Sequence, residues 1–425
     1  MSTPAPSNSA APAAPSESAP APASRPKGWF NRNVLGMGLT SFFADLCYET
    51  AGAALPSLWK ALGAPAYALG LTEGAADMLS NFAKLASGWW SDRWGKRKPL
   101  VVLGYAVTTA GIGLIAVAAV WPVVLLCRVL AWIGKGLRGP PRNALLTDSV
   151  SPADRGKAFG VHRTADTIGA IIGPLFAAWL IRRVGLGGVG ANDGLRTVFL
   201  WALVPGTLSV LAMAFLVRDP GHTGPARRPF FASVGALPVP FRRFLAAVGV
   251  FGAGDFSHTM LILAAVEALT PRFGLTEAAA TGATLLALRN TVAAVTAFPV
   301  GWASDHMGRR GLLALGYAFG VLVIAGFAVA MGRGETSTLL FALLFSGAGI
   351  FTAVEETLEG ATAADLVPDA TLRGTAFGVL GAVNGIGDFV ASLAVGLLWA
   401  ISPAVGLGYA AVTMAAGTAM LAWRR

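Results

Sequence analysis

Ionisable side chains recur inside long apolar stretches of this 425-residue sequence. Placing a carboxylate or a guanidinium near the centre of a bilayer costs at least about 2.5–3.5 kcal/mol on insertion scales. We therefore expect these groups to face a polar chamber, where carboxylates can pair with cations and change their protonation. They are Asp45, Glu49, Asp77, Lys84, Arg128, Lys135, Arg138, Arg142, Arg163, Asp166, Asp255, His258, Glu267, Arg289, Glu355, Glu356, Glu359 and Asp388.

Spacing indicates which of these charges can meet on one helix. Asp45 and Glu49 lie four residues apart, so they share a helix face. Arg163 and Asp166 lie three residues apart, so they can either pair on their own helix or contribute to a common site. Lys84 lies one turn from a predicted loop, where its side chain can reach the membrane surface instead. Arg138 and Arg142 lie near the predicted cytoplasmic end of their helix, where a gate or topology role is the alternative, and Glu267 lies near the outer mouth, where it can be solvated.

The composition indicates a membrane protein. The chain is 55% hydrophobic and 13% charged, whereas soluble proteins carry about a quarter charged residues. A net charge of +10 would suit nucleic acid in a soluble protein. Here the basic residues gather in particular loops without interleaved aromatic residues, so no nucleic-acid partner is predicted.

Enzyme and metal motifs are missing from the sequence. It contains no GxxxxGK[ST], HExxH or GxSxG pattern, so we predict neither direct ATP coupling nor an enzyme. Cys47 and Cys127 lie in apolar segments without disulfide or metal-ligand spacing. His258 and Met260 are too few for a metal site. We expect no metal and no cofactor, with a proton or ion gradient as the energy source.

Hydropathy and turn residues predict twelve membrane spans, because runs of about twenty apolar residues match a hydrocarbon core of about 30 Å. With the N-terminus inside the cell, most Lys and Arg residues fall in cytoplasmic loops and termini, as the positive-inside rule requires. We predict a multi-pass inner-membrane protein with both termini in the cytoplasm. The spans are 33–58, 67–90, 99–120, 122–145, 158–181, 196–217, 243–268, 279–302, 312–331, 338–361, 375–400 and 404–422.

Two halves of related sequence follow a tail of different composition. Residues 1–27, rich in Pro, Ala and Ser, are expected to be disordered. Residues 28–217 are predicted to form one six-helix bundle, 218–242 a cytoplasmic linker, and 243–425 a second bundle. RGKAFGVHRTADTIG at 155–169 resembles RGTAFGVLGAVNGIG at 373–387, which indicates a parallel duplication.

One charged motif occurs in each half. GWWSDRWGKRKP begins at Gly88, and GWASDHMGRRGL begins at Gly301. Each follows an apolar span and combines an aspartate near a helix end with a basic cluster. We predict that this patch latches the halves together on the cytoplasmic side in one state and releases them in another. Its residues are Gly88, Asp92, Arg93, Gly95, Lys96, Arg97, Asp305, Gly308, Arg309 and Arg310.

The repeated motif resembles the loop signature of the major facilitator superfamily. Two further features are similar to that family. Arg128 resembles an arginine that the family links to proton coupling, although Trp132 stands where a glycine is usual. Gly169, Gly173 and Pro174 resemble a fifth-helix motif of antiporters. From about residue 33 to 425 the chain looks like a poorly characterised prokaryotic branch.

The resemblance implies an all-α membrane fold with twelve transmembrane helices in two pseudo-symmetric six-helix bundles. It also implies that the first, fourth, seventh and tenth helices line a central cavity. On those helices, the predicted substrate and proton residues are Asp45, Glu49, Arg128, Asp255, His258, Glu355 and Glu359. The predicted supporting charges are Arg163, Asp166, Arg289, Glu356 and Asp388.

The function that fits these features is secondary active transport of a small molecule by alternating access. We favour proton-coupled export, or antiport, of a drug or metabolite by a monomer in the lipid bilayer. One alternative is an importer of a metal chelate, a siderophore or another nutrient, which an acidic cavity with His258 and Met260 would suit. Another is a transport-inactive membrane sensor or scaffold.

We expect both copies of the charged motif to lie on the cytoplasmic face. Single cysteines replacing Asp92 or Asp305, in a chain without Cys47 and Cys127, should react with an impermeant maleimide in inside-out vesicles and not in intact cells. The measurement is the labelled fraction in each preparation. Labelling of the two positions from opposite faces would refute the duplicated arrangement.

Overall fold

The computed structural model describes residues 28–94, 96–185, 191–219 and 234–423. Helices account for the secondary structure of these residues, and no strand occurs among them. The first half contains α1 (Arg32–Ala61), α2 (Ala66–Trp94), α3 (Lys98–Ile115), α4 (Trp121–Asp148), the 3-10 turn η1 (Pro152–Asp154), α5 (Arg155–Val184) and α6 (Ala191–Leu216). The second half contains α8 (Val239–Gly252), α9 (Thr259–Met307), α10 (Arg309–Gly332), α11 (Thr338–Leu366), α12 (Ala370–Leu398) and α13 (Pro403–Ala422).

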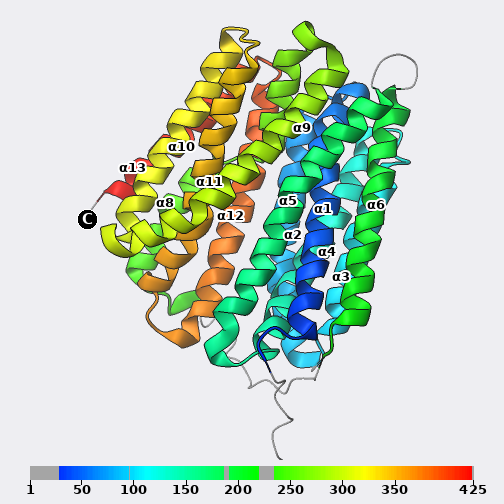
Figure 1. The fold of residues 1–425 in the computed structure, drawn as a ribbon. Coiled ribbons are helices and arrows are strands. Elements are labelled where there is room, and N and C mark those ends of the chain that lie inside the picture. Colours follow the sequence, from blue (N-terminus) through cyan, green and yellow to red (C-terminus); the bar gives the residue numbers. More distant parts are fainter. Residues whose placement is uncertain (1–27, 95, 186–190, 220–233, 424–425) are drawn as a thin grey trace, which may run out of the picture.

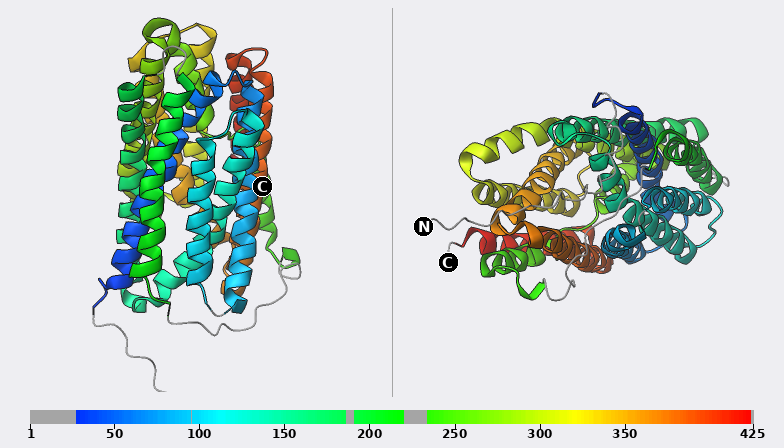
Figure 2. Two further views of the ribbon diagram at one scale, coloured as in Figure 1. Left: turned by 90° about the vertical axis from the view of Figure 1, so that its right-hand side faces the viewer. Right: turned by 90° about the horizontal axis from the view of Figure 1, so that it is seen from below.

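The two halves stand beside each other as two lobes of steeply inclined helices (Figures 1 and 2). We call the end where α1, α3 and α5 begin the terminal end, and the opposite end the far end. Eight described helices are long and apolar enough to cross a membrane. α1, α2 and α4 span a similar length but carry more charge. The predicted all-α fold of two six-helix bundles is confirmed. The predicted tail, 1–27, and linker residues 220–233 lie outside the described residues, so the domain boundaries stay predictions.

The seventh span is interrupted, which corrects the continuous helix predicted at 243–268. α8 ends at Gly252 and α9 begins at Thr259, so Asp255 lies in non-helical backbone between them. A side chain at Gly254 would lie 2.5 Å from the Ala410 carbonyl of α13, so glycine lets the break pack closely against that helix. Irregular backbone at membrane depth is tolerated where protein or a polar cavity surrounds it. The break therefore marks a place where polar groups gather.

The predicted seventh and eighth spans meet at a sharp corner rather than a loop. α9 contains the second part of the predicted seventh span and the whole of the eighth, but Gly274 has φ 76° and ψ 164°, which divides the helix into two segments. A positive φ of this size favours glycine, since other residues rarely adopt it. Figure 1 shows the chain turning over at the far end and descending towards Met307.

Close backbone packing joins the halves at the far end. A Cβ on Gly70 of α2 would lie 2.0 Å from the Ser392 carbonyl of α12, and one on Gly396 would lie 2.8 Å from Cα of Tyr67. Side chains add to this closure. Lys60 Nζ donates to Thr270 Oγ1 at 3.2 Å, and Arg182 pairs with Glu277 at 3.1 Å. The far end is therefore closed chiefly because small residues let α2 and α12 touch.

Glycines in α5 place that helix directly behind the charged face of α1. A Cβ on Gly169 would lie 2.4 Å from the Phe42 carbonyl, and one on Gly173 would lie 2.9 Å from Cβ of Glu49. Pro174 lies inside α5. The fifth-helix motif thus has a packing role in this structure. It lets α1 and α5 approach beside Glu49.

Two glycines of α12 offer a matched test of the far-end closure. We expect Gly396→Ala to lower the melting temperature, because its new methyl group meets α2 backbone that cannot yield freely; overpacking of this kind costs about 1–3 kcal/mol. Gly381→Ala adds the same methyl group where nothing lies within 4 Å, and should be neutral or stabilising. The measurement is thermal unfolding in detergent. Equal melting temperatures for the two variants would contradict the packing.

Candidate functional site

A cavity of about 290 Å³ lies between the two halves. Both halves supply its walls, through α1, α2, α4, α9, α10, α11, α12 and the break before α9. A volume of this size suits a small solute, since ligand pockets usually span about 300–1,000 Å³. Its polar and aromatic lining residues include Tyr48, Glu49, Glu73, Asp77, Arg128, Trp132, Lys135, Asp255, Phe256, Ser257, His258, Arg289, Phe351, Thr352, Glu355, Glu356 and Asp388.

The cavity brings together many of the charges predicted from sequence. Among the predicted substrate and proton residues, the lining includes Glu49, Arg128, Asp255, His258 and Glu355. Among the predicted supporting charges, it includes Arg289, Glu356 and Asp388. Asp45 and Glu359 lie outside the lining, each in a buried polar cluster of its own half.

A buried ion pair joins α2 to α4 at the wall of the cavity. Arg128 Nε donates to Glu73 Oε1 at 2.7 Å, and Arg128 Nη2 donates to Glu73 Oε2 at 3.0 Å. Both side chains are 2% exposed. Two parallel bonds in a dry setting are the strongest geometry available to this pair. Each group therefore solvates the other in place of water.

Sequence reasoning missed Glu73. The predicted second span, 67–90, contains it four residues before Asp77, which was recognised. The same four-residue spacing that grouped Asp45 with Glu49 would have placed Glu73 and Asp77 on one helix face. That spacing can be seen in the sequence. The partner of Glu73 on α4 cannot be predicted in the same way, because pairing between helices depends on how each helix is rotated.

Aromatic rings hold the cations of α4 in the cavity wall. The Arg128 guanidinium lies 3.4 Å from the centre of the Trp132 ring. Trp132 in turn donates its indole N–H to Asp77 at 2.7 Å. Lys135 Nζ lies 4.3 Å from the centre of the Tyr48 ring. The tryptophan that departs from the glycine of the family pattern thus supports Arg128 through a cation–π contact.

The second half contributes an acidic wall. Asp255 comes from the break before α9, Glu355 from α11 and Asp388 from α12. The carboxyl groups of Asp255 and Glu355 lie within hydrogen-bonding reach of each other. Ionised carboxylates that approach each other repel, and a proton or a cation bound between them relieves that repulsion.

Arg289 enters from the second segment of α9. Its Nη2 donates to Thr352 Oγ1 at 2.7 Å, and the neighbouring Asn290 donates to the Ala170 carbonyl of α5 at 2.9 Å. Arg163 also links the halves, through an ion pair with Glu356 at 2.7 Å. Its contact with Asp166 on its own helix is longer, at 3.4 Å. Arg163 therefore contacts both its own helix and the other half.

Asp45 lies in a buried cluster beside the cavity. It accepts a hydrogen bond from the hydroxyl of Tyr48, and its carboxyl lies within hydrogen-bonding reach of Asp166. Ser41 donates to Asp166 at 2.6 Å. Since Tyr48 lines the cavity, this cluster connects with the chamber through the phenol.

The duplicated halves carry opposite charges at matching positions. Asp148 is the last residue of α4, and Asp365 is the last but one of α11, the helix that we align with it. Counting back from these two residues pairs Arg138 with Glu355 and Arg142 with Glu359. A tyrosine contacts the second pair of positions in both halves. Arg142 donates to the Tyr105 hydroxyl at 3.3 Å, whereas Tyr317 donates to Glu359. Asn384 also donates to Glu359, at 2.8 Å.

In each half, an arginine of the repeated motif contacts a carboxylate near the end of another helix, α4 in the first half and α11 in the second. Arg97 pairs with Asp148, and Arg309 pairs with Asp365 at 2.8 Å. Asp219 accepts from the backbone N–H groups of Arg97 and Lys98 at 2.7 and 2.8 Å. These contacts stay within each half and tie its helix ends together.

The remaining motif residues are only partly described. Arg310 donates to the carbonyls of Leu421 and Trp423 near the end of α13. Gly308 has φ 85°, which favours glycine between α9 and α10. Lys96 is exposed. Ordinary contacts surround both leading glycines, since a Cβ would lie 3.6 Å from Pro140 at Gly88 and 3.7 Å from Thr357 at Gly301. Gly95 lies outside the described residues, as do the side chains of Asp92, Arg93 and Asp305.

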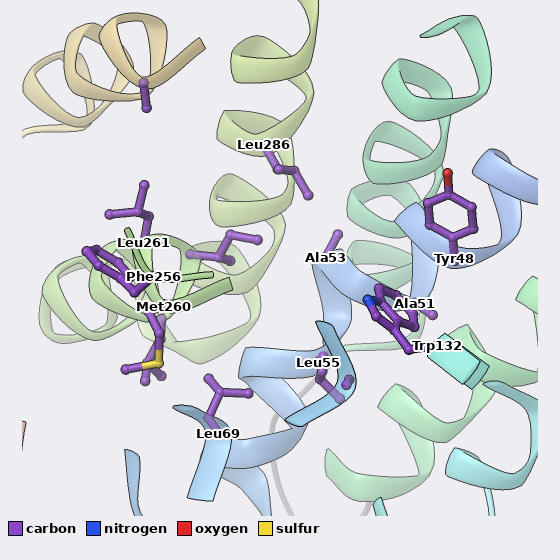
Figure 3. Close-up of a cluster of buried hydrophobic side chains, with 14 of the residues drawn as sticks. Tyr48, Ala51, Ala53, Leu55, Leu69, Trp132, Phe256, Met260, Leu261 and Leu286 are labelled. Atoms are coloured by element: carbon purple, nitrogen blue, oxygen red, sulfur yellow. The ribbon is translucent and has the colours of Figure 1, made fainter. Parts of the chain in front are cut away.

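His258 and Met260 lie in different surroundings. Figure 3 shows Met260 clustered with Phe256 and Leu261 near the start of α9, and Met260 is fully buried. His258 lines the cavity instead. Among the described residues, no group of three or more His, Cys, Asp or Glu side chains is placed to hold a metal ion.

Two similar six-helix halves around a charged central cavity are the architecture of one class of membrane transporters. The family model described as Major Facilitator Superfamily matches residues 37–392, so the chain belongs to this superfamily and is a multi-pass membrane protein.

Relatives and solved structures agree with this assignment. An uncharacterized MFS-type transporter of Methanocaldococcus jannaschii is 31% identical over 90% of this chain and 92% of its own length. The multidrug resistance protein MdtH of Cronobacter sakazakii is 34% identical over 28% of this chain and 30% of its own. A solved nucleoside transporter, NupG, shares the fold with a TM-score of 0.76 at 15% identity, covering 92% of this chain and all of its own. A bacterial homolog of the human lysosomal transporter Spinster, inward-facing and occupied, has a TM-score of 0.71 at 19% identity over 91% and 95%.

The buried ion pair can be tested by removing one or both charges. We expect Arg128→Met to lower the free energy of unfolding by about 3–5 kcal/mol, because it strands the Glu73 carboxylate. The double variant Arg128→Met with Glu73→Leu should recover much of this loss. Arg182→Met breaks a half-exposed pair and should cost at most about 1 kcal/mol. The measurement is detergent-phase unfolding. Equal losses in the single and double variants would count against the pair.

Proposed function

We propose that this protein is a proton-coupled secondary transporter that exports a small organic solute by alternating access. The observation that carries the proposal is the charged cavity between the two halves. Binding residues from both halves converge there, so rocking one half against the other would expose the same site to each side in turn. A ligand drives such a change only if it binds the two states differently, and a site built by both halves meets that requirement.

Carboxyl groups outnumber cationic side chains along the cavity wall. Glu73 is already paired with Arg128, and Glu356 with Arg163. The other acidic residues that the second half contributes to the cavity, Asp255, Glu355 and Asp388, form no such ion pair among the described contacts. Asp255 and Glu355 are therefore our choice for the proton carriers, because their adjacent carboxyls favour holding a proton between them.

The direction of transport rests on orientation and on two similarities. The positive-inside bias favours a cytoplasmic terminal end in the inner membrane, which would make the far-end closure the extracellular gate. The fifth helix resembles the antiporter motif of the family, and one partial relative is named a multidrug resistance protein. These features favour export by a monomer in exchange for protons. A small-molecule substrate and lipid are the partners that we propose.

Purified protein in liposomes with a trapped pH-sensitive dye provides the test. We expect one or more small solutes from a screen of drugs and metabolites to cause proton movement across the membrane. Asp255→Asn with Glu355→Gln should reduce that flux at least tenfold, because it removes both proposed carriers. Glu335→Gln, on the far-end loop before α11, should leave the flux unchanged.

Three results would argue against this proposal. Full solute-driven proton flux in the double variant would remove the assigned carriers. Uptake of a metal chelate, with no effect of any organic solute, would favour an importer. Cellular activity that survives loss of both carboxyls, without flux in liposomes, would favour a sensor.

A further inference from the structure

The Glu73 carboxylate receives hydrogen bonds from both halves of the molecule. Arg128 of α4 supplies the two bonds from the first half. From the second half, Thr259 Oγ1 donates to Oε2 at 2.8 Å and Ser257 Oγ donates to the same atom at 3.2 Å. Ser257 and Thr259 flank the point where α9 begins. The carboxylate therefore connects α2 and α4 directly to the interrupted seventh span.

These contacts have the features of strong hydrogen bonds. The acceptor is a carboxyl group paired with a guanidinium, and hydrogen bonds that involve a charged group are roughly twice as strong as neutral ones. Glu73, Ser257 and Thr259 are all buried, so water does not compete readily. The second half also fixes the donors in place, because the Ser257 backbone N–H donates to Ser392 Oγ of α12 at 3.0 Å. Ser392 belongs to the stretch of α12 that packs against Gly70 at the far end.

We propose that Glu73 is a positioning residue that latches the far end of the transporter in its closed state. Its charge holds Ser257 and Thr259, and thereby the second half, against the first half. Separating the halves at the far end has to break both hydroxyl bonds, whereas the Glu73–Arg128 pair moves with the first half and stays intact. The proposal rests on alternating access from the proposed function, but it requires neither a particular solute nor proton coupling.

The position of the latch also explains why the seventh span is interrupted. In a continuous helix, the backbone groups of residues 253–258 would form hydrogen bonds within the helix, and their side chains would be distributed around it. The break instead lets Ser257 and Thr259 turn towards α2, and it leaves the neighbouring Asp255 and His258 in the cavity wall. The same six-residue segment thus provides cavity residues and the cross-half contact, so occupation of the cavity and strength of the latch share one structural element.

Distances between the halves test the latch directly. In a chain carrying Cys47→Ala and Cys127→Ala, spin labels at Val117 and Ile401 report the far end, and labels at Lys157 and Met307 report the terminal end. All four label sites are exposed. Pulsed electron resonance on protein in nanodiscs gives each distance distribution.

The key variant combines S257A with T259V, which removes both donors and leaves the Glu73–Arg128 pair intact. We expect the ratio of far-end-open to far-end-closed molecules to rise roughly tenfold, which corresponds to about 1.4 kcal/mol. E73Q should shift it in the same direction, because it removes the charge that strengthens the bonds. The matched control is T284V, since Thr284 lies on the same helix but donates within it, to the Ala280 carbonyl at 2.9 Å. Its distributions should equal those of the parent.

An unchanged far-end distribution in the folded S257A/T259V protein would overturn the latch, whether or not the parent moves protons. An equal shift in T284V would also overturn it, because the effect would then be general loosening of α9. Absence of proton flux from the parent, measured separately in liposomes, would overturn the proposed coupling and leave the latch standing. The two proposals can therefore be refuted separately, because each depends on a different measurement.

Discussion

Ionised groups inside a bilayer have to be solvated by the protein itself, and this constraint shapes the interior of the transporter. The Glu73–Arg128 pair is its clearest expression, with both side chains 2% exposed and two direct hydrogen bonds between them. Trp132 covers the guanidinium, and hydroxyl groups from the other half donate further hydrogen bonds to the carboxylate. Because each partner is costly to bury alone, the pair fixes α2 against α4 and determines where the second half can dock.

Small residues solve the complementary problem of bringing helices together without a hydrophobic effect between them. Glycines at the far end let α2 and α12 meet through backbone atoms, and glycines of α5 let that helix lie behind α1. Packing of this kind is non-directional and can be undone by a small separation. The hydrogen bonds to Glu73 add direction to the same interface. Closure thus combines a broad, easily separated contact with a few strong bonds.

The sequence predicted the fold well because its signals are local. Apolar length, loop charge and the repeat at 155–169 and 373–387 fixed the number of spans and the two halves. Residues 253–258 were predicted as helix, although the structure has a break there. Gly-Ala-Gly-Asp is tolerated inside apolar spans, and no local pattern in the sequence indicates that Gly254 packs on α13. The same contrast between local and long-range signals applies to the site residues. Asp255 and Glu355 were recognised as buried charges, whereas Glu73 and the cross-half donors depend on helix rotation and on partners about 55 to 186 residues away along the chain.

Duplication gave the two halves the same framework and opposite chemistry. Arg138 and Arg142 in the first half correspond to Glu355 and Glu359 in the second, with Tyr105 and Tyr317 contacting the second position of each pair. Guanidinium groups stay charged in proteins, so the first half supplies fixed positive charge at these positions. Carboxyls can gain and lose protons, so the second half holds titratable groups at these positions. An asymmetry of this kind lets one half respond to protons while the other serves as its electrostatic reference, which is why we assign the proton carriers to the second half.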